Sequence, residues 1–313
     1  MNLQQNKPSF ESTLKSAETE EFIDLHFYRP IGYRWALLFN KWGITPNQIT
    51  ILSIIIGMAA GVCFYFTGFW FNLLGVFLLI WANSYDSADG QLARMTHQKT
   101  ELGRILDGAA SYFWFGAIYS AIIFRSWEAW GIWIFLLALF SGYSHGKQSA
   151  MADYYRNLHL LFLKGKTNSE LDNSSELKEK YKNTRWKEKP LVKFFEKMYL
   201  VYTEGQENWS VKLQKMLQII NTQYAGKTPE WLPEAFCKKS FPLLKYTNML
   251  SFNMRSIALF VCVLSGFPFA YFLFEISVMN IILIYTVRQY GNICKELAGR
   301  LIRPDYSFRS LNS

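Results

Sequence analysis

Three aspartates beside two apolar stretches are the residues in this sequence best suited to chemistry. Asp86 and Asp89 follow one apolar stretch, and Asp107 lies near the start of the next. Carboxylates at the edge of hydrocarbon are costly unless they are paired or hold a cation. If the first stretch continues as a helix, Asp86 and Asp89 share one face, and Asp107 can close a site with them. Without nearby Cys or suitably spaced His, these oxygen ligands favour Mg²⁺ or Mn²⁺ over zinc.

A divalent cation at a lipid boundary indicates a substrate that carries phosphate and has an apolar end. A structural role is the alternative, in which Asp86 and Asp89 cap helices and pair with Arg94 and Arg104. The residues between these positions help to decide between the two interpretations.

A longer pattern of acidic, small and basic residues surrounds the aspartates. In chain order its fixed positions are Asp86, Asp89, Gly90, Ala93, Arg94, Gly103 and Asp107. With this spacing the stretch resembles the signature D-x-x-D-G-x-x-A-R-x8-G-x3-D-x3-D of the CDP-alcohol phosphotransferase (CDP-alcohol phosphatidyltransferase) family. The last aspartate of the signature is replaced by Ser111. Agreement at every other fixed position makes the signal specific.

The resemblance is weaker outside the signature. It includes the Tyr-Arg-Pro of 28–30, the Thr-Pro-Asn-Gln-Ile-Thr of 45–50 and the arrangement of six expected spans. It covers about the first 156 residues and the last two spans, and nothing in it corresponds to segment 164–245.

The resemblance implies that an alcohol hydroxyl attacks the β-phosphorus of a CDP-linked lipid or polyol and releases CMP. Asp86, Asp89 and Asp107 would be ligands of two divalent cations, which neutralise the pyrophosphate and the charge on departing CMP. Arg94 would bind a phosphate through its planar guanidinium, although it can also be a cytoplasmic anchor.

The small residues of the signature have an implied role in binding the nucleotide. Gly90, Ala93 and Gly103 would let it approach the helix backbones closely. Close helix packing in a membrane explains small residues equally well.

Ser111 departs from the family at a position with two implied roles. The family's aspartate helps to hold metal and is the favoured general base for the acceptor hydroxyl. A serine hydroxyl is a weak neutral ligand and cannot accept a proton near neutral pH. No other acid lies on this span, and the next along the chain is Glu128, across the membrane, so both the second cation and the base are in question.

Three accounts of Ser111 remain open. A cation or a substrate phosphate can activate the acceptor hydroxyl. His145 can be the base, because Ser141, His145 and Ser149 recur every four residues and form one helical stripe, and imidazole titrates in a suitable range. The ordinary alternative is that His145 lies at an interfacial helix end. Finally, the protein can be an inactive relative with a binding or scaffolding role.

Arg156 lies further along the same helix, in a place similar to the family's basic stretch near the acceptor. With Lys147 nearby, it would contact a phosphorylated acceptor such as an inositol phosphate or glycerol phosphate. An ordinary cytoplasmic flank explains it equally well.

Apolar stretches of spanning length position these residues. Of 313 residues, 50% are hydrophobic and only 18% are charged, which excludes a disordered chain. A spanning helix needs about 20 apolar residues, and six stretches meet or approach that length. They are 50–69, 70–85, 105–124, 127–143, 249–272 and 274–287. The second and the last are short, so we expect them to continue as helices beyond the apolar residues.

Positive charge is concentrated on one side of these spans. The connections between spans one and two, three and four, and five and six carry almost no charge, the last only Glu275. The other side is rich in Lys and Arg, and 16 of the 33 lie in 164–245 alone. The positive-inside rule therefore predicts a cell-membrane protein with both termini, the active site and this insert in the cytoplasm.

The chain is expected to have four segments. They are a cytosolic and interfacial segment 1–48, spans one to four at 49–163, the cytosolic insert 164–245, and spans five and six with a cytosolic tail at 246–313. Within the first, 21–42 suits a helix in the headgroup plane or one packed on the bundle. Pro46 and Asn47 then mark a helix start. Within the insert, apolar spacing predicts a helix at 194–220.

The sequence thus predicts an all-α integral membrane enzyme with six transmembrane helices, an N-terminal interfacial helix and a cytosolic insert. Its substrates would be a CDP-alcohol, most of all CDP-diacylglycerol, and a small polar alcohol, with Mg²⁺ or Mn²⁺ as cofactor. The alternative is a catalytically impaired membrane scaffold, whereas a transporter would place polar groups near the bilayer midplane. Nucleic-acid binding suits only the net charge of +9. Family members are often dimers, so the resemblance also suggests a homodimer.

Overall fold

Every regular element of the described chain is helical. The structure, a computed structural model, describes residues 10–13, 18–98, 100–165, 169, 171–185 and 190–302. No strand occurs in these ranges, which confirms the all-α prediction for them. The chain divides into two compact units. The first holds the described residues up to Ser141 with Arg255–Phe274, and the second holds Gly142–Met254 with the described residues from Glu275 onward.

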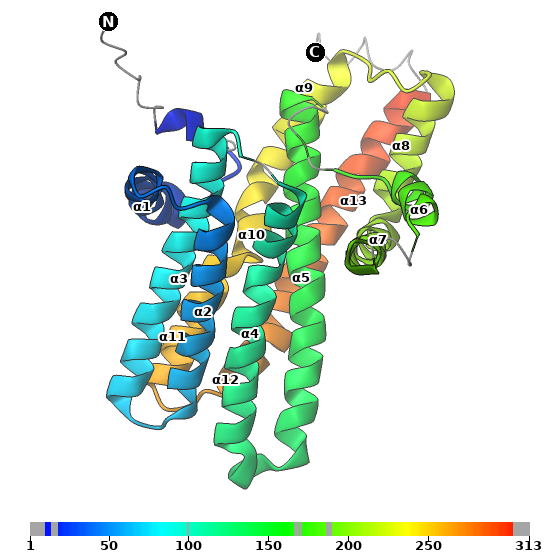
Figure 1. Ribbon diagram of the computed structural model, residues 1–313. Coiled ribbons are helices and arrows are strands. Elements are labelled where there is room, and N and C mark those ends of the chain that lie inside the picture. The colour runs from blue at the N-terminus through cyan, green and yellow to red at the C-terminus, as the bar shows by residue number, and fades with distance from the viewer. Residues whose placement is uncertain are drawn as a thin grey trace, which may run out of the picture. The chain divides into compact units, whose positions relative to one another are not determined.

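Three long helices form the centre of the first unit (Figure 1). They are α2 (Pro46–Tyr65), α3 (Phe69–Thr96) and α4 (Glu101–Trp130). α2 contacts both of the others. A Cβ on Gly57 of α2 would overlap the indole of Trp114, whose Nε1 donates to the carbonyl of Ser53 at 3.0 Å. Small residues therefore let α2 approach α4 closely, and this contact helps to position the helices that carry the aspartates.

A shorter helix packs on α3. The π-helix Asp24–Tyr28 leads into α1 (Arg29–Lys41), within the range expected for the N-terminal helix. The two helices share one apolar cluster, which includes Ala36, Phe39, Tyr85, Ala88 and Leu92. α1 therefore packs on α3. The location of α1 in the plane of the lipid headgroups stays a prediction.

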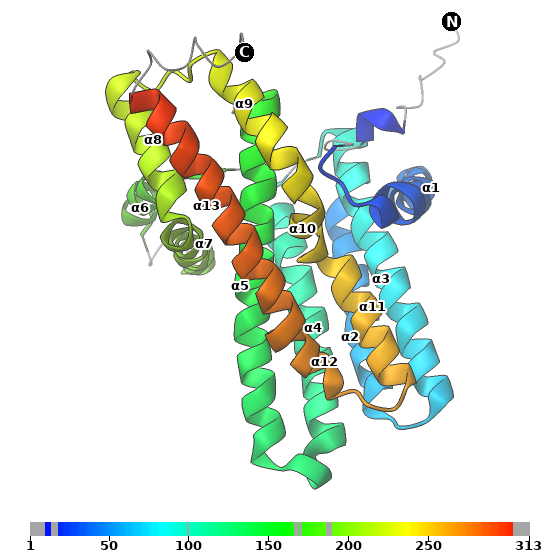
Figure 2. The same cartoon turned by 180° about the vertical axis from the view of Figure 1, so that it is seen from behind.

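The second unit contains most of α5 (Ile132–Lys164) and the helices of the insert. In chain order the others are α6 (Ser174–Asn183), α7 (Pro190–Trp209), α8 (Val211–Gln223), α9 (Trp231–Ser240), α10 (Leu244–Met249) and α13 (Asn280–Ile302). α8, α9 and α10 contact α13, as Figure 2 shows from behind. The helix predicted at 194–220 is confirmed as α7 and α8, which are separated at Ser210.

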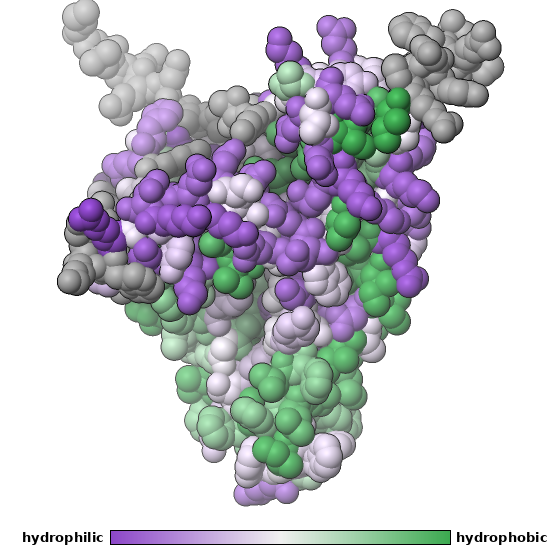
Figure 3. All heavy atoms as spheres, turned by 90° about the vertical axis from the view of Figure 1, so that its right-hand side faces the viewer, coloured by the Kyte–Doolittle hydropathy of each residue, from purple (hydrophilic) through white to green (hydrophobic). Residues whose placement is uncertain are grey.

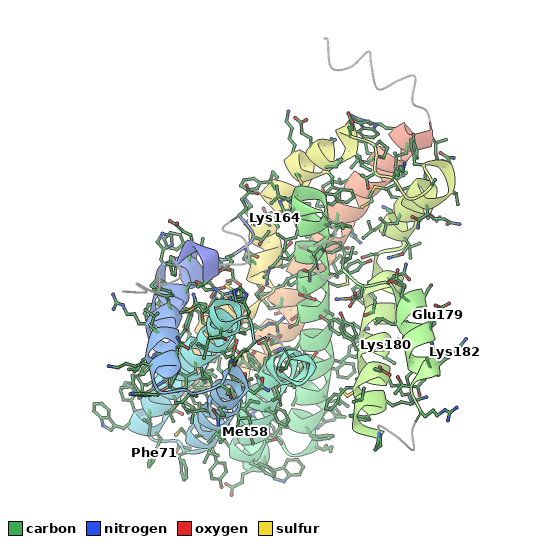
Figure 4. The ribbon with its side chains drawn as sticks, turned by 45° about the horizontal axis from the view of Figure 1, so that its top comes forward. Met58, Phe71, Lys164, Glu179, Lys180 and Lys182 are labelled. Atoms are coloured by element: carbon green, nitrogen blue, oxygen red, sulfur yellow. The ribbon has the colours of Figure 1, made fainter. Side chains whose placement is uncertain are left out.

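Three helical runs of the described chain are long and apolar enough to cross a membrane. They are Pro46–Tyr65, Trp231–Leu264 and Ala270–Ile302. The positions of the other expected spans are helical too, in α3, α4 and α5, but the total of six membrane spans stays a prediction. Met58 of α2 and Phe71 of α3 point outward with 42% and 50% exposure (Figure 4). Lipid would cover such side chains.

The structure corrects two of the expected boundaries between spans. Residues 127–130 were expected to begin the fourth span, but they belong to α4, which ends at Gly131 with φ +51°. The fifth span was expected to reach residue 272, whereas α11 (Phe252–Leu264) ends before Gly266 with φ +83°. In both places a glycine adopts a backbone conformation that interrupts the helix.

The last span also differs from expectation at its start. Glu275 was expected in a connecting loop, but it is fully buried in the π-helix Glu275–Met279. That π-helix lies within the run Ala270–Ile302, so the last expected span continues as a helix at both ends. Glu275 is therefore a buried acid and not a loop charge.

Candidate metal and nucleotide site

The three predicted aspartates come together where α3 and α4 approach each other. Asp86 and Asp89 belong to α3 and Asp107 to α4. One carboxylate oxygen of each lies within 4.8 Å of the others. Asp89 is buried, Asp86 half-buried and Asp107 exposed, so the cluster is accessible on the α4 side.

These oxygens fit a hard cation. Mg²⁺ binds oxygen at about 2.1 Å in an octahedron, so two of its ligands lie at most about 4.2 Å apart. The 4.8 Å limit of the cluster is close to this value, and small side-chain rotations would complete the site. Neither Cys nor His belongs to the cluster in the described chain, which favours Mg²⁺ or Mn²⁺ over zinc. The residues fit the cation, and its binding stays a prediction.

The carboxylates repel one another when no cation neutralises them. Burial raises the pKa of Asp86 well above its ordinary value, and Asp89 and Asp107 raise it further. Burial also raises the pKa of Asp89, with a further increase from Asp107 and an opposing effect of the hydrogen bond from Thr50. A divalent cation would reverse this balance and favour the ionised carboxylates.

Thr50 of α2 supports the buried aspartate from the neighbouring helix. Its hydroxyl lies 2.5 Å from Oδ2 of Asp89 and 3.1 Å from the carbonyl oxygen of Pro46. No role for Thr50 followed from its position in the sequence, although the family-like segment 45–50 contains it. The signal available in the sequence for such a role was a hydroxyl side chain at the edge of an apolar stretch.

Gly103 packs closely against two polar side chains of the protein. Asn47 was expected to cap α2, but Thr45 precedes that helix and its backbone nitrogen donates to Oε1 of Gln48 at 2.9 Å. Asn47 instead accepts at 3.3 Å from the hydroxyl of Thr100, which itself caps α4 by accepting from the Gly103 nitrogen at 2.9 Å. A Cβ on Gly103 would lie only 2.6 Å from Oδ1 of Asn47.

Gly90 has no comparable packing constraint. A Cβ there would lie 3.5 Å and 3.6 Å from the two terminal nitrogens of Arg94, an ordinary contact with a flexible group. Protein packing therefore does not explain this glycine, and close approach of the nucleotide to the α3 backbone stays the prediction for it. Ala93, on the same helix, is half-buried.

Arg94 holds a buried donor next to the cluster. Its Nε donates to the carbonyl oxygen of Thr13 at 2.5 Å. Its Nη2 is buried and has no hydrogen-bond partner among the described residues. Burial and, next, Arg29 lower the pKa of Arg94 to about 10, so the guanidinium stays charged at neutral pH. A phosphate oxygen would satisfy this donor.

Arg29 is a second cationic side chain at the cluster, and its position in the sequence indicated no role at the site. Its charge lowers the pKa of Asp86, against the larger effect of burial. Its Nε lies 2.7 Å from Oε2 of Glu20, and its Nη1 donates to the hydroxyl of Ser87 at 3.4 Å. The similarity at 28–30 pointed to this residue without indicating a function.

Ser111 follows Asp107 by one turn of α4 and is half-buried. Residues at this spacing share a helix face, so Ser111 occupies the position of the fourth aspartate in the signature. The site accordingly has three carboxylates where the family signature has four.

His145 lies in the second unit beside a buried acid. Its Nδ1 is 3.7 Å from Oε1 of Glu275, whose side chain is 0% exposed. Gln148 donates to the carbonyl of Glu275 at 2.9 Å and to Oδ1 of Asn280 at 2.7 Å. His145 is inside α5, not at a helix end as the ordinary alternative required. Single π-turns often mark functional positions, but a catalytic role of His145 stays a prediction.

Arg156 is also in the second unit, where it contacts the end of α10. Its Nη2 donates to Oγ of Ser251 at 2.6 Å and to Oδ1 of Asn248 at 3.2 Å. Its Nε is buried with no hydrogen-bond partner in the described chain. Binding of a phosphorylated acceptor by Arg156 therefore stays a prediction.

A family comparison agrees with the signature. The family model described as CDP-alcohol phosphatidyltransferase matches residues 43–146. This range contains the aspartate cluster, Ser111 and His145. Residues 43–146 thus match the CDP-alcohol phosphatidyltransferase family, which confirms the resemblance predicted from the signature.

Two proteins of Aquifex aeolicus (strain VF5) are similar to part of the chain. One, described as a bifunctional IPC transferase and DIPP synthase, is 33% identical over 117 residues, which cover 36% of this chain and 26% of that protein. An uncharacterized protein is 30% identical over 119 residues, which cover 37% of this chain and 59% of that protein. The similarity thus spans about a quarter of the first relative and less than two thirds of the second.

Alanine substitutions at Gly103 and Gly90 test whether each glycine is needed for packing or for nucleotide binding. Gly103→Ala is expected to lower the unfolding temperature, because a Cβ would displace the Asn47 and Thr100 side chains at the start of α4, and loss of a helix cap costs about 0.5–2 kcal/mol. Gly90→Ala should fold normally, since alanine favours a helix by up to about 1 kcal/mol, but it should weaken nucleotide binding. Thermal unfolding and calorimetry with a CDP-alcohol measure the two effects. Unchanged nucleotide affinity in Gly90→Ala would contradict the ligand explanation.

Removing one carboxylate charge from the cluster is expected to change both the pH dependence of stability and the stabilisation by Mg²⁺. Because the folded protein binds more protons than the unfolded one, the cation-free protein should lose stability as pH rises from acid toward neutral. Asp86→Asn should flatten this dependence. Mg²⁺ at 100 times its Kd should stabilise the unsubstituted protein by about 2.7 kcal/mol and the variant much less. Equal stabilisation of both by Mg²⁺ in thermal unfolding would rule out the cation site.

Proposed function

We propose that the protein transfers a substituted phosphate from a CDP-alcohol to a small polar alcohol and releases CMP. The observation that carries this proposal is the aspartate cluster beside Gly90 and the buried Nη2 of Arg94. An acidic cluster alone would suit many cations. Its combination with an open backbone position and an unsatisfied basic donor suits a cation-bound pyrophosphate.

Each of these residues has a distinct proposed part. Asp86, Asp89 and Asp107 hold Mg²⁺ or Mn²⁺, which when bound neutralises charge on the pyrophosphate and on departing CMP. Thr50 orients the Asp89 carboxylate. Arg94 donates from Nη2 to a phosphate oxygen, and Gly90 admits the nucleotide to the surface of α3.

The acceptor hydroxyl needs a proton acceptor that Ser111 cannot provide. In the favoured account a substrate phosphate accepts this proton, or a cation held by the aspartates would make the hydroxyl more acidic, and Ser111 would contribute a weak neutral ligand. His145 is the second candidate, with Glu275 available to orient its ring and to stabilise its protonated form.

The donor substrate we favour is CDP-diacylglycerol, because its lipid tail suits a site at the edge of apolar helices. The acceptor enters from water, so the site must be open both to the cytosol and to the bilayer. The charge distribution supports a cytoplasmic location of the site and of both termini. Arg156 is the proposed contact of a phosphorylated acceptor, and a homodimer is a further expectation.

A catalytically impaired scaffold is the competing function, and Ser111 is the observation that favours it. The decisive assay incubates the purified protein with CDP-diacylglycerol, Mg²⁺ or Mn²⁺ and a panel of alcohols. The panel contains inositol, inositol phosphate, glycerol phosphate and serine. Lipid products and CMP are then measured by mass, and the scaffold function predicts that neither is formed.

Two substitutions in the cluster should change this activity in opposite directions. Asp89→Asn is expected to reduce CMP release by at least about 100-fold, since removal of a preorganised charge has effects of that order. Ser111→Asp should raise the rate if the missing carboxylate limits it. Thermal unfolding of both variants controls for folding. Normal turnover of a folded Asp89→Asn variant would exclude the proposed chemistry.

The histidine alternative predicts a characteristic pH dependence. If neutral His145 accepts the proton, activity should fall at acid pH, and His145→Ala should lose this acid limb together with about 100-fold in kcat. Glu275→Gln should show a smaller decrease in kcat at similar KM. Ser149→Ala, on the same helix stripe, serves as the control. A His145→Ala variant with unchanged kcat removes this residue from the mechanism.

A further inference from the structure

The insert helix α7 carries an exposed apolar stripe. Phe194, Met198 and Val201 are 49%, 55% and 59% exposed. Their spacing of four and three residues places them on one helix face. Single exposed apolar side chains are ordinary, but three in a row form a face that no described part of the protein covers.

The opposite side of α7 is covered by α6. Lys180 of α6 pairs with Glu196 at 3.8 Å, and the hydroxyl of Ser174 donates to Glu207 at 2.5 Å. Lys182 points away from α7 (Figure 4), and hydrophilic side chains gather over this pair of helices (Figure 3). The α6–α7 pair therefore has one charged side and one apolar side.

α7 meets α5 where the surface of α5 changes from apolar to charged. Tyr143 is 64% exposed, and one turn later the Nζ of Lys147 lies 5.8 Å from the centre of its ring. A Cβ on Gly205 of α7 would lie 3.2 Å from this Nζ. Gln206 of α7 donates to the carbonyl of Ala150 at 2.8 Å. Tyrosine and lysine at such a boundary are typical of a membrane–water interface.

The same change of surface occurs on α13 beside the end of α7. Ile281 and Tyr285 are 69% and 39% exposed, and Arg288 is the first charged residue of this helix. Lys212, three residues after the end of α7, donates to Oδ1 of Asn292 at 3.3 Å. Asn292 lies about one turn beyond Arg288. Figures 1 and 2 show α7 nearly along its axis while α5 and α13 run lengthwise, so the axis of α7 is directed across the axes of α5 and α13.

We propose that α7 lies in the plane of the membrane surface and inserts Phe194, Met198 and Val201 at the level of the lipid headgroups. A helix with one apolar face that crosses spanning helices at their apolar-to-charged boundary meets the requirements of an interfacial helix. α7 meets α5 next to the exposed Tyr143, at the level where the apolar surface of α5 ends, so we assign lipid as the occupant of the stripe and not a second copy of the chain. Lys197, exposed beside the stripe, can reach lipid phosphates with its amine.

Lipid contact can be tested on the full chain in nanodiscs. The native Cys63, Cys237, Cys262 and Cys294 are replaced by Ser or Ala, and Met198→Cys or the control Lys182→Cys is labelled with the NBD fluorophore. The label at 198 should be quenched several-fold more than the label at 182 by lipids with a spin label near the headgroup. Soluble iodide should quench in the opposite order. Val201→Cys should behave like Met198→Cys, and circular dichroism verifies the fold.

Two results would overturn the proposal. Equal quenching of positions 198 and 182 by iodide would mean that the stripe faces water. Protection of position 198 from both quenchers would mean that protein covers it, either a second copy or another part of the chain.

Discussion

Mutual repulsion of three carboxylates at the edge of apolar helices is the constraint on which the site depends. Asp89 is buried and Asp86 half-buried, and burial together with the neighbouring acids raises both pKa values. Such a cluster is unfavourable for a protein that has no use for it. Arg29, Arg94 and the Thr50 hydroxyl only partly offset this cost, and a divalent cation would offset it more completely. Cation binding would therefore link the stability of the first unit to binding of the proposed substrate through the same charges.

Close packing of α2, α3 and α4 maintains this arrangement. Gly57 admits the Trp114 indole, and Gly103 leaves room for the Asn47 side chain. Gly90 differs from both, because its surroundings would accept a methyl group. Small residues in one signature can therefore have different purposes, and only their surroundings distinguish packing from ligand access.

The second unit combines buried polar groups with an amphipathic surface. Glu275, His145, Gln148 and Asn280 form a polar cluster around a π-helix, while α7 presents apolar side chains outward. The family comparison matches only residues 43–146, so α7 and the rest of the insert fall outside it. If α7 contacts lipid, the insert adds a membrane attachment outside the segment that matches the family.

The sequence by itself determined the features that depend on local spacing. The all-α class, the pairing of Asp86 with Asp89, the position of Ser111 and the family signature all follow from residues less than about seven turns apart. Tertiary structure decided which distant residues meet. Thr50 binds Asp89 across 39 positions, Arg94 reaches Thr13 across 81, and Glu275 is buried beside His145 instead of lying in a loop. Helix periodicity states which side chains share a face, but the contacts between faces depend on how the helices pack, and no local pattern in one chain encodes that packing.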